Sequence, residues 1–258
     1  ILFAVAAYKK ELPRFTWLHI RAFLILGTIG VAVPVPLLTF LAAKLPVGII
    51  TLLLVLVPLL TYVMSYLLRI EKFRLSGMIG VLIGLSGMLF VLVPKTGLPE
   101  PDMVVWVLLA LIGPLCFASC NAFVVILRPA GTPSLAMATG MSASATVLLA
   151  PVMMGCGQTF VFPAATLDGN LVILYAAAIT AATTVAWFTL VRITGPVFFS
   201  QFNYFIVLGG FGWGYILEGE RHSFWVWIAT AMAFAGLAIF TRGAKSLEAQ
   251  AQAAAPAE

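Results

Sequence analysis

Long apolar runs dominate this sequence and decide which solvent it folds in. A bilayer core is about 30 Å thick and a helix rises about 1.5 Å per residue, so a spanning helix needs about 20 apolar residues. Eight runs of roughly that length follow one another, at 18–43, 47–69, 75–94, 103–127, 134–155, 169–191, 196–217 and 223–241. With 62% hydrophobic and 9% charged residues, the chain is too apolar to fold in water. The sequence predicts an all-α integral membrane protein.

A shorter apolar stretch, ILFAVAAY, stands at residues 1–8. It is long enough for less than half a crossing. An interfacial helix would show a polar face, and this stretch has none before Tyr8. A signal peptide would carry its positive charge in front, whereas Lys9 and Lys10 follow this stretch. We therefore interpret it as the end of a spanning helix whose beginning is missing, which gives eight full spans plus a partial first helix.

The basic residues between the spans predict the orientation. Short loops make successive spans antiparallel, so the loops alternate between the two sides of the membrane. Eleven of the 14 basic residues then fall on one side, which the positive-inside rule assigns to the cytoplasm. They are Lys9, Lys10, Arg14, Arg21, Arg69, Lys72, Arg74, Arg128, Arg192, Arg242 and Lys245. Basic residues scattered in this way form no stripe for nucleic acid.

The two halves of the chain resemble each other at an offset of 149 residues, which brings YLLRIE at 66–71 onto YILEGE at 215–220. The same offset pairs Gly80 with Ala229, Gly84 with Ala233 and Gly87 with Gly236. Small residues at this spacing line one helix face and let helix backbones approach in lipid. Such matches also arise by chance in a chain rich in Gly and Ala. Glu71 is cytoplasmic and Glu220 external in this topology, so the two units are predicted to be inverted, which requires an odd number of helices in each.

These features resemble the EamA-like branch of the drug/metabolite transporter superfamily. The resemblance rests on Pro58 within LVLVPLLTYVMSYLLRIE, on GMIGVLIGLSGMLF, and on GERHSFWVWIATAMAFAGLAIF in the second half. It implies a helical bundle of two inverted five-helix repeats. Residues 1–95 would form the first repeat, without its first helix and most of its second, and 103–243 the second repeat. Val207, the counterpart of Pro58, departs from this symmetry.

The polar residues inside the spans are uncharged, since Asp, Glu, Lys and His are absent from their middle. No catalytic motif accompanies them, and the three cysteines lack metal-type spacing, so we expect no enzyme activity, no metal site and no cofactor. Six polar or aromatic residues at helical spacing are predicted to face a central cavity between the halves and to bind substrate. They are Tyr62, Asn121, Trp187, Gln201, Asn203 and Tyr204.

Polar stripes of this kind have a structural explanation as well. They also arise from hydrogen bonds between helices, or from threonines bonded to their own backbone. That explanation is favoured for the lone threonines of 169–191. Side-chain amides are costly in lipid, which favours a wet cavity for Asn121, Gln201 and Asn203.

The resemblance implies a secondary transporter in the inner membrane. We expect it to export a small neutral, zwitterionic or amphipathic metabolite by alternating access. The alternatives are a binding or scaffold protein of the membrane without transport and, less favoured, an intramembrane enzyme. The expected partners are the lipid bilayer and a small-molecule substrate, with no nucleic acid, and the sequence leaves a homodimer open.

The tail at 244–258 is predicted to be disordered and cytoplasmic, because Arg242 and Lys245 hold the end of the last span inside. A fluorescent reporter fused after Glu258 is therefore expected to be active in the cytoplasm, and a periplasmic phosphatase fused there to be inactive. The opposite pair of results would contradict the predicted orientation.

Overall fold

The computed structural model describes residues 1–45, 47–96, 104–155, 157, 167–206, 208–209, 227–228 and 231–242. The regular structure in these residues is helical throughout, with no strand among them. The chain divides into two compact units. The first unit contains Ile1–Pro36 and Phe123–Gly195, and the second contains Leu37–Ala122 and Pro196–Glu258. Each unit therefore draws residues from both predicted repeats, whose boundaries stay a prediction.

Within the described residues, four helical segments are long and apolar enough to cross a bilayer. They are Trp17–Leu41, Val104–Leu127, Ser134–Gly155 and Gly169–Thr194, and each agrees with a predicted span to within three residues at either end. Val57–Leu67, Leu75–Gly87, which is part of the helix Leu75–Thr96, and Ala231–Arg242 are shorter apolar segments. The all-helical class is confirmed, whereas the predicted count of eight full spans is not.

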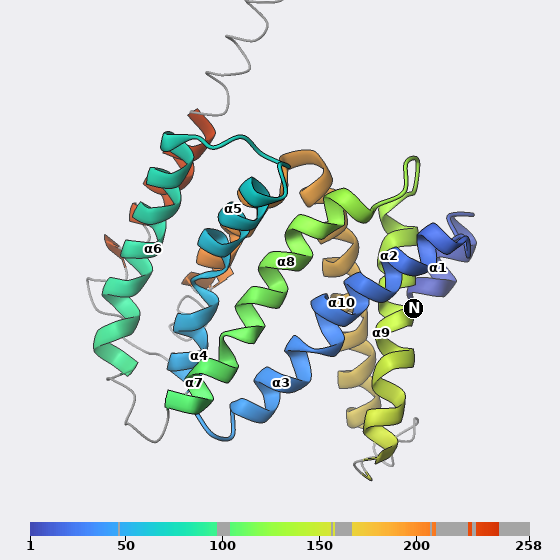
Figure 1. Ribbon diagram of the computed structural model, residues 1–258. Coiled ribbons are helices and arrows are strands. Elements are labelled where there is room, and N and C mark those ends of the chain that lie inside the picture. Colours follow the sequence, from blue (N-terminus) through green and yellow to red (C-terminus); the bar gives the residue numbers. More distant parts are fainter. Residues whose placement is uncertain are drawn as a thin grey trace, which may run out of the picture. The chain divides into compact units, whose positions relative to one another are not determined.

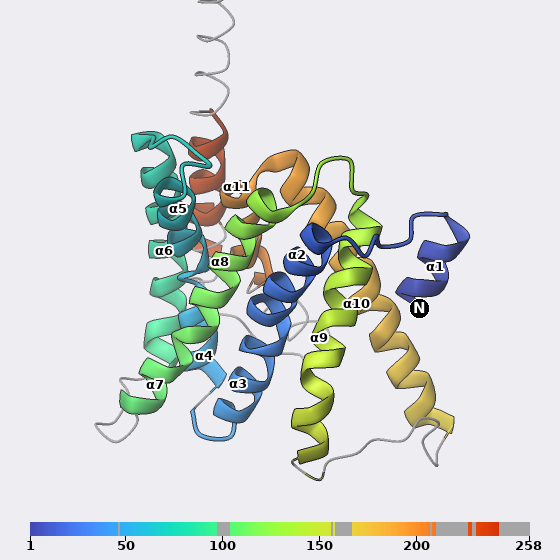
Figure 2. The same ribbon diagram turned by 45° about the vertical axis from the view of Figure 1, so that its right-hand side comes forward.

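The first unit is organised around α9 (Ser134–Gly155). It packs against α1 (Leu2–Tyr8), α2 (Trp17–Gly27), the π-helical turn η1 (Thr28–Ala32) and α10 (Leu167–Thr194). Figure 2 shows α9 with α10 on one side and α2 on the other. This one helix therefore joins segments from the two ends of the unit's sequence.

Small residues bring α2 and α9 close together. A Cβ added to Gly140 would lie 2.5 Å from the ring of Phe23, and one added to Gly27 would overlap the hydroxyl of Ser144. The same hydroxyl donates a hydrogen bond to the backbone oxygen of Phe23 at 2.6 Å. The pair is thus held by glycine packing and by a hydrogen bond that crosses between the helices.

The second unit contains α4 to α7, most of α8, α11 and a helix at Ala231–Arg242 (Figure 1). Their bounds are Val47–Leu54 for α4, Val57–Leu67 for α5, Leu75–Thr96 for α6, Val104–Ala110 for α7, Ile112–Leu127 for α8 and Pro196–Ser200 for α11. The helix α4 packs against α6 and α7, and α5 packs against α6 and α11.

Prolines interrupt two of the predicted spans. The sequence predicts one helix over 47–69, but the structure has two, α4 and α5. Pro58 lies at the start of α5, where it has no N–H to donate and its ring would clash with the carbonyl of Leu54. Ahead of α3 (Pro34–Leu41), the N–H of Val33 donates to the oxygen of Thr28, five residues earlier, at 2.9 Å. This wide turn accommodates Pro34, which has no N–H to donate to the preceding turn.

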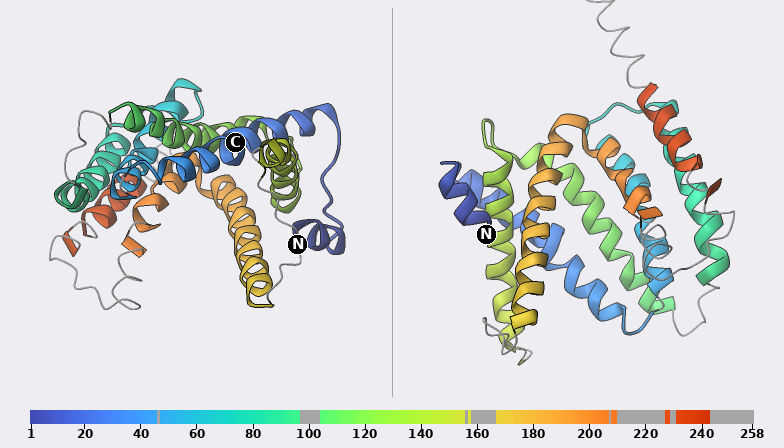
Figure 3. Two further views of the ribbon diagram at one scale, coloured as in Figure 1. Left: turned by 90° about the horizontal axis from the view of Figure 1, so that it is seen from below. Right: turned by 180° about the vertical axis from the view of Figure 1, so that it is seen from behind.

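Glycine also sets the packing of α6 against the helix Ala231–Arg242, shown in Figure 3. A Cβ added to Gly80 would lie 2.5 Å from the carbonyl oxygen of Gly236, and one added to Gly236 would overlap the carbonyl of Gly80. The backbone nitrogen of Gly84 lies 3.0 Å from that second Cβ. The two backbones touch, as the small-residue faces of the sequence predict.

Several predicted features lie outside the described residues. These are Ala229, Glu220, the end of the predicted span 196–217, Tyr215 with its predicted pairing to Tyr66, and the tail 244–258.

Replacing Gly236 by Leu is expected to destabilise the protein by about 1–3 kcal/mol, because the added side chain has to displace the backbone of α6. Ala235 is exposed on the same helix and gives a matched control, Ala235→Leu, with little effect expected. Unfolding in mixed micelles of rising dodecyl sulfate content measures both. Equal midpoints for the two variants would contradict the backbone contact.

Candidate functional site

Buried polar side chains concentrate in the second unit, on α5 and directly after α11. Thr61 and Ser65 lie one turn apart on α5, and both are 0% exposed. Gln201 follows the end of α11 and is 1% exposed. Because α5 packs against α11, these three buried side chains belong to the same packed part of the second unit. We refer to Thr61, Ser65 and Gln201 as the buried polar set.

The polar atoms of this set have no hydrogen-bond partner. The Thr61 and Ser65 hydroxyls and both amide atoms of Gln201 are buried without one in the described part of the chain. Leaving such an atom unpaired costs about 1–3 kcal/mol. Hydroxyls in helices commonly donate to their own backbone, as Thr139 does to the oxygen of Leu135 at 2.7 Å. Unlike the Thr139 hydroxyl, the polar atoms of the buried polar set are left without this kind of backbone partner.

Tyr62 and Tyr204 are also buried in the second unit, and their hydroxyls have backbone partners. The Tyr62 hydroxyl donates to the backbone oxygen of Arg74 at 2.7 Å and accepts from its N–H at 2.8 Å. The Tyr204 hydroxyl donates to the backbone oxygen of Val81 at 3.2 Å, and its ring packs against Gly84. Both tyrosines thus fix the position of α6, and their predicted contact with substrate stays a prediction.

The remaining three predicted site residues lie in different surroundings. Asn121 is buried on α8. Asn203 is half-buried, and its amide nitrogen donates to the backbone oxygen of Ser200 at 2.8 Å. Trp187 belongs to the first unit and packs edge-on against Phe188, with ring centroids 4.5 Å apart. Five of the six predicted residues therefore belong to the second unit, and Trp187 belongs to the first.

The threonines of α10 follow the structural explanation. Thr184 donates to the oxygen of Thr180 at 2.7 Å, and Thr183 donates to the oxygen of Ile179 at 2.9 Å. Each hydroxyl is satisfied within its own helix, as the sequence favours for these residues.

Several buried polar residues were not singled out from the sequence, among them Thr61 and His19. Thr61 lies four residues before Ser65, so its helical spacing to that residue is the signal that identifies it. His19 is buried between two hydroxyls, with Thr16 at 2.7 Å from Nδ1 and Thr132 at 3.1 Å from Nε2. Its partner Thr132 is 113 residues away in the sequence, so no local sequence pattern predicts the contact.

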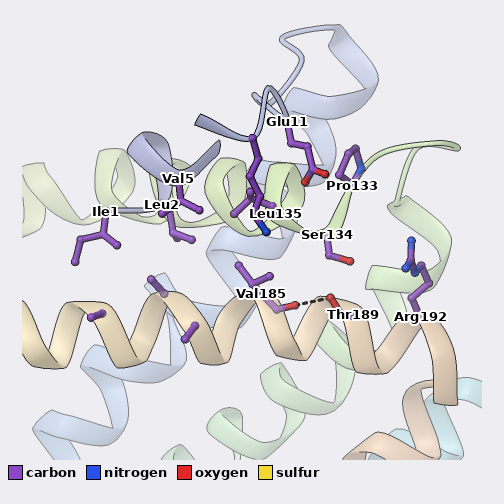
Figure 4. A pocket seen from close by; sticks show the side chains of 14 residues that line it. Ile1, Leu2, Val5, Glu11, Pro133, Ser134, Leu135, Val185, Thr189 and Arg192 are labelled. Atoms are coloured by element: carbon purple, nitrogen blue, oxygen red, sulfur yellow. Dashed lines mark hydrogen bonds between the residues drawn. The ribbon is translucent and has the colours of Figure 1, made fainter. Parts of the chain in front are cut away.

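A cavity of about 530 Å³ opens in the first unit among α1, the start of α9 and α10. Figure 4 shows its lining, which is apolar around Leu2 and Val5. Lys9, Glu11 and Arg192 supply the charged part of the lining. None of the six predicted site residues is among the described residues that line this cavity.

Comparison with known proteins finds one matching family model. Residues 1–93 match the EamA-like transporter family. The match covers about a third of the chain and agrees with the resemblance inferred from the sequence.

One solved structure, described only as a crystal structure of a protein, shares the fold. It aligns with a TM-score of 0.74 at 19% sequence identity, over 93% of this chain and 83% of its own. No curated protein matches the chain.

Replacing Gln201 by Leu is expected to leave the free energy of unfolding unchanged or to raise it by up to about 2 kcal/mol, because a buried amide without a partner becomes an apolar side chain of similar size. Ser144→Ala, which removes a hydroxyl bonded to the backbone, is expected to lose about 1 kcal/mol. Unfolding in mixed micelles compares the two. A loss in Gln201→Leu as large as that in Ser144→Ala would show that the amide has a partner.

Proposed function

We propose that this EamA-like protein is a secondary transporter that exports a small neutral, zwitterionic or amphipathic solute across the inner membrane by alternating access. The observation that carries the proposal is the buried polar set. Its hydroxyls and amide offer both donors and acceptors, and they lie unpaired where lipid supplies no partner. A solute that brings polar groups to this position would offset that cost.

The uncharged character of the interior supports the choice of solute. Among the described residues, the buried polar side chains are hydroxyls, amides and His19, with no carboxylate, lysine or arginine. Such an interior recognises a ligand by hydrogen bonds and apolar packing rather than by ion pairing. A solute with a large net charge would find no counter-charge there.

The contact between α6 and the helix Ala231–Arg242 supports two inverted repeats as the framework. A two-fold axis requires reciprocal contacts, so if Gly80 meets the counterpart of Gly87, then Gly87 has to meet the counterpart of Gly80. The counterpart of Gly87 at the offset of 149 residues is Gly236, and Gly80 does meet it. The reciprocal pair, Gly87 with Ala229, is part of the proposal.

The composition of the first unit agrees with the same framework. It contains residues 1–36 together with 150–185, which are their partners at the offset of 149. Alternating access in transporters built from inverted repeats proceeds by movement of one set of helices against another. We further propose a cytoplasmic C-terminus, a bilayer and a small solute as the partners, and no nucleic-acid partner.

A scaffold without transport is the second candidate. It is favoured by the hydroxyls of Tyr62 and Tyr204, which donate hydrogen bonds to the backbone oxygens of Arg74 and Val81. Flux into proteoliposomes separates it from a transporter. A transporter is expected to give saturable movement of at least one solute from a panel of neutral and zwitterionic amino acids, and a scaffold gives none for any of them.

The double variant Gln201→Leu with Asn203→Leu is expected to reduce that flux about tenfold or more, because two hydrogen-bonding amides are lost. Thr183→Val is the matched control, since this hydroxyl bonds to its own helix, and its flux is expected to stay unchanged. Flux and unfolding are measured on the natural full-length protein. Normal flux in the double variant would contradict the assignment of the site. It would not contradict the proposal that the protein is a transporter.

A further inference from the structure

A second cavity in the first unit has a basic lining. It measures about 450 Å³ and lies between the loop that joins α8 to α9 and the last turn of α10. Arg128 lines it from the loop and Arg192 from α10. It shares Pro133 and Arg192 with the larger cavity of Figure 4, where Arg192 is drawn at the edge of the lining. Two guanidinium groups from distant parts of the sequence therefore border one space.

The guanidinium of Arg128 is held in place by its own loop. Its Nε donates to the backbone oxygen of Thr132 at 3.1 Å, its Nη2 donates to the same oxygen, and Nη2 also lies 3.4 Å from the hydroxyl of Ser134. Arginine has five N–H donors, and the two on Nη1 have no partner among the described residues. The group is thus ordered before any ligand arrives, which lowers the entropic cost of binding.

The two arginines have no acidic partner. The ion pair found in the described part of the chain joins Arg74 to Glu71, which both belong to the second unit. Burial, together with the like charge of Arg192, holds the pKa of Arg128 below its usual value, although a guanidinium remains cationic. Lys9 and Glu11 line the adjoining cavity and carry opposite charges. The surroundings of Arg128 and Arg192 therefore keep an excess of positive charge.

Two ordinary explanations account for part of this arrangement. A cation in the last turn of α10 interacts favourably with the helix dipole, and basic residues favour cytoplasmic loops. Each explains why one arginine is present. Neither explains why two guanidinium groups border the same cavity, where their mutual repulsion opposes folding.

We propose that this cavity binds a phosphate group between Arg128 and Arg192, supplied either by the headgroup of an anionic lipid or by free phosphate. Guanidinium groups pair with phosphate oxygens through short charge-assisted hydrogen bonds, and the oxygens of a single phosphate group can accept from both guanidinium groups at once. A Cβ added to Gly131, which lines the cavity, would meet nothing within 4 Å, so the loop leaves space at this position. This site is separate from the buried polar set and does not depend on the transport proposal.

The test uses two probes on the purified natural full-length protein. Native mass spectrometry counts the phosphatidylglycerol retained after release from nanodiscs of phosphatidylcholine with phosphatidylglycerol, and calorimetric titration measures binding of inorganic phosphate. Arg192→Gln is expected to weaken binding of the effective probe about fivefold. Arg192→Lys is expected to keep most of the affinity, because it keeps the charge.

Arg192 makes no side-chain hydrogen bond within the described residues, so Arg192→Gln is expected to fold normally, whereas Arg128→Gln also removes bonds that shape the loop. Arg21→Gln is the control, since Arg21 is exposed in the same unit and lines neither cavity. Retained phosphatidylglycerol that depends on Arg192 identifies a lipid headgroup, and phosphate binding that depends on Arg192 identifies the free ion. Equal binding in the wild type and Arg192→Gln, or binding of neither probe, would overturn the proposal.

Discussion

A polar atom buried in a membrane protein without a hydrogen-bond partner has a cost that the rest of the fold has to offset. This constraint falls on Thr61, Ser65 and Gln201, while other described hydroxyls, such as that of Thr139, are satisfied by their own helix. Three features of the second unit accompany this set. A helix break precedes α5, the glycine face of α6 admits the ring of Tyr204, and α11 ends directly before Gln201. The packing thus presents unpaired polar groups at fixed positions, which is what a solute site requires.

The parts of the fold that depend on local physics follow from the sequence. A run of apolar residues long enough to cross a bilayer has few alternatives to a helix, which is why Ser134–Gly155 has the predicted bounds. The small-residue face of α6 is likewise readable from its spacing, and its contact with Gly236 confirms that reading. The sequence leaves a kink or a break at Pro58 open, because proline is compatible with either, and packing decides for the break between α4 and α5.

The site was less predictable, because a sequence shows where a polar group lies but not what it bonds to. Tyr62 and Gln201 were both singled out, yet the Tyr62 hydroxyl is occupied by the backbone of Arg74 while the Gln201 amide is unpaired. His19 and Thr132 meet across 113 residues of sequence, a contact that only the folded chain reveals. Arg128 and Arg192 were assigned to the cytoplasmic side by charge counting, which gives no hint that they border one cavity.

The most direct measurement is the water accessibility of position 201. After Cys116, Cys120 and Cys156 are replaced by Ala, the variants Gln201→Cys and Phe202→Cys are treated with a membrane-impermeant thiol reagent in intact cells and in inside-out vesicles. Phe202 is exposed on the surface of the second unit, next to the buried Gln201, and serves as the control. Alternating access through the buried polar set predicts labelling of position 201 from both sides and little labelling of position 202. A cysteine at position 201 that reacts from neither side in the folded protein would contradict it.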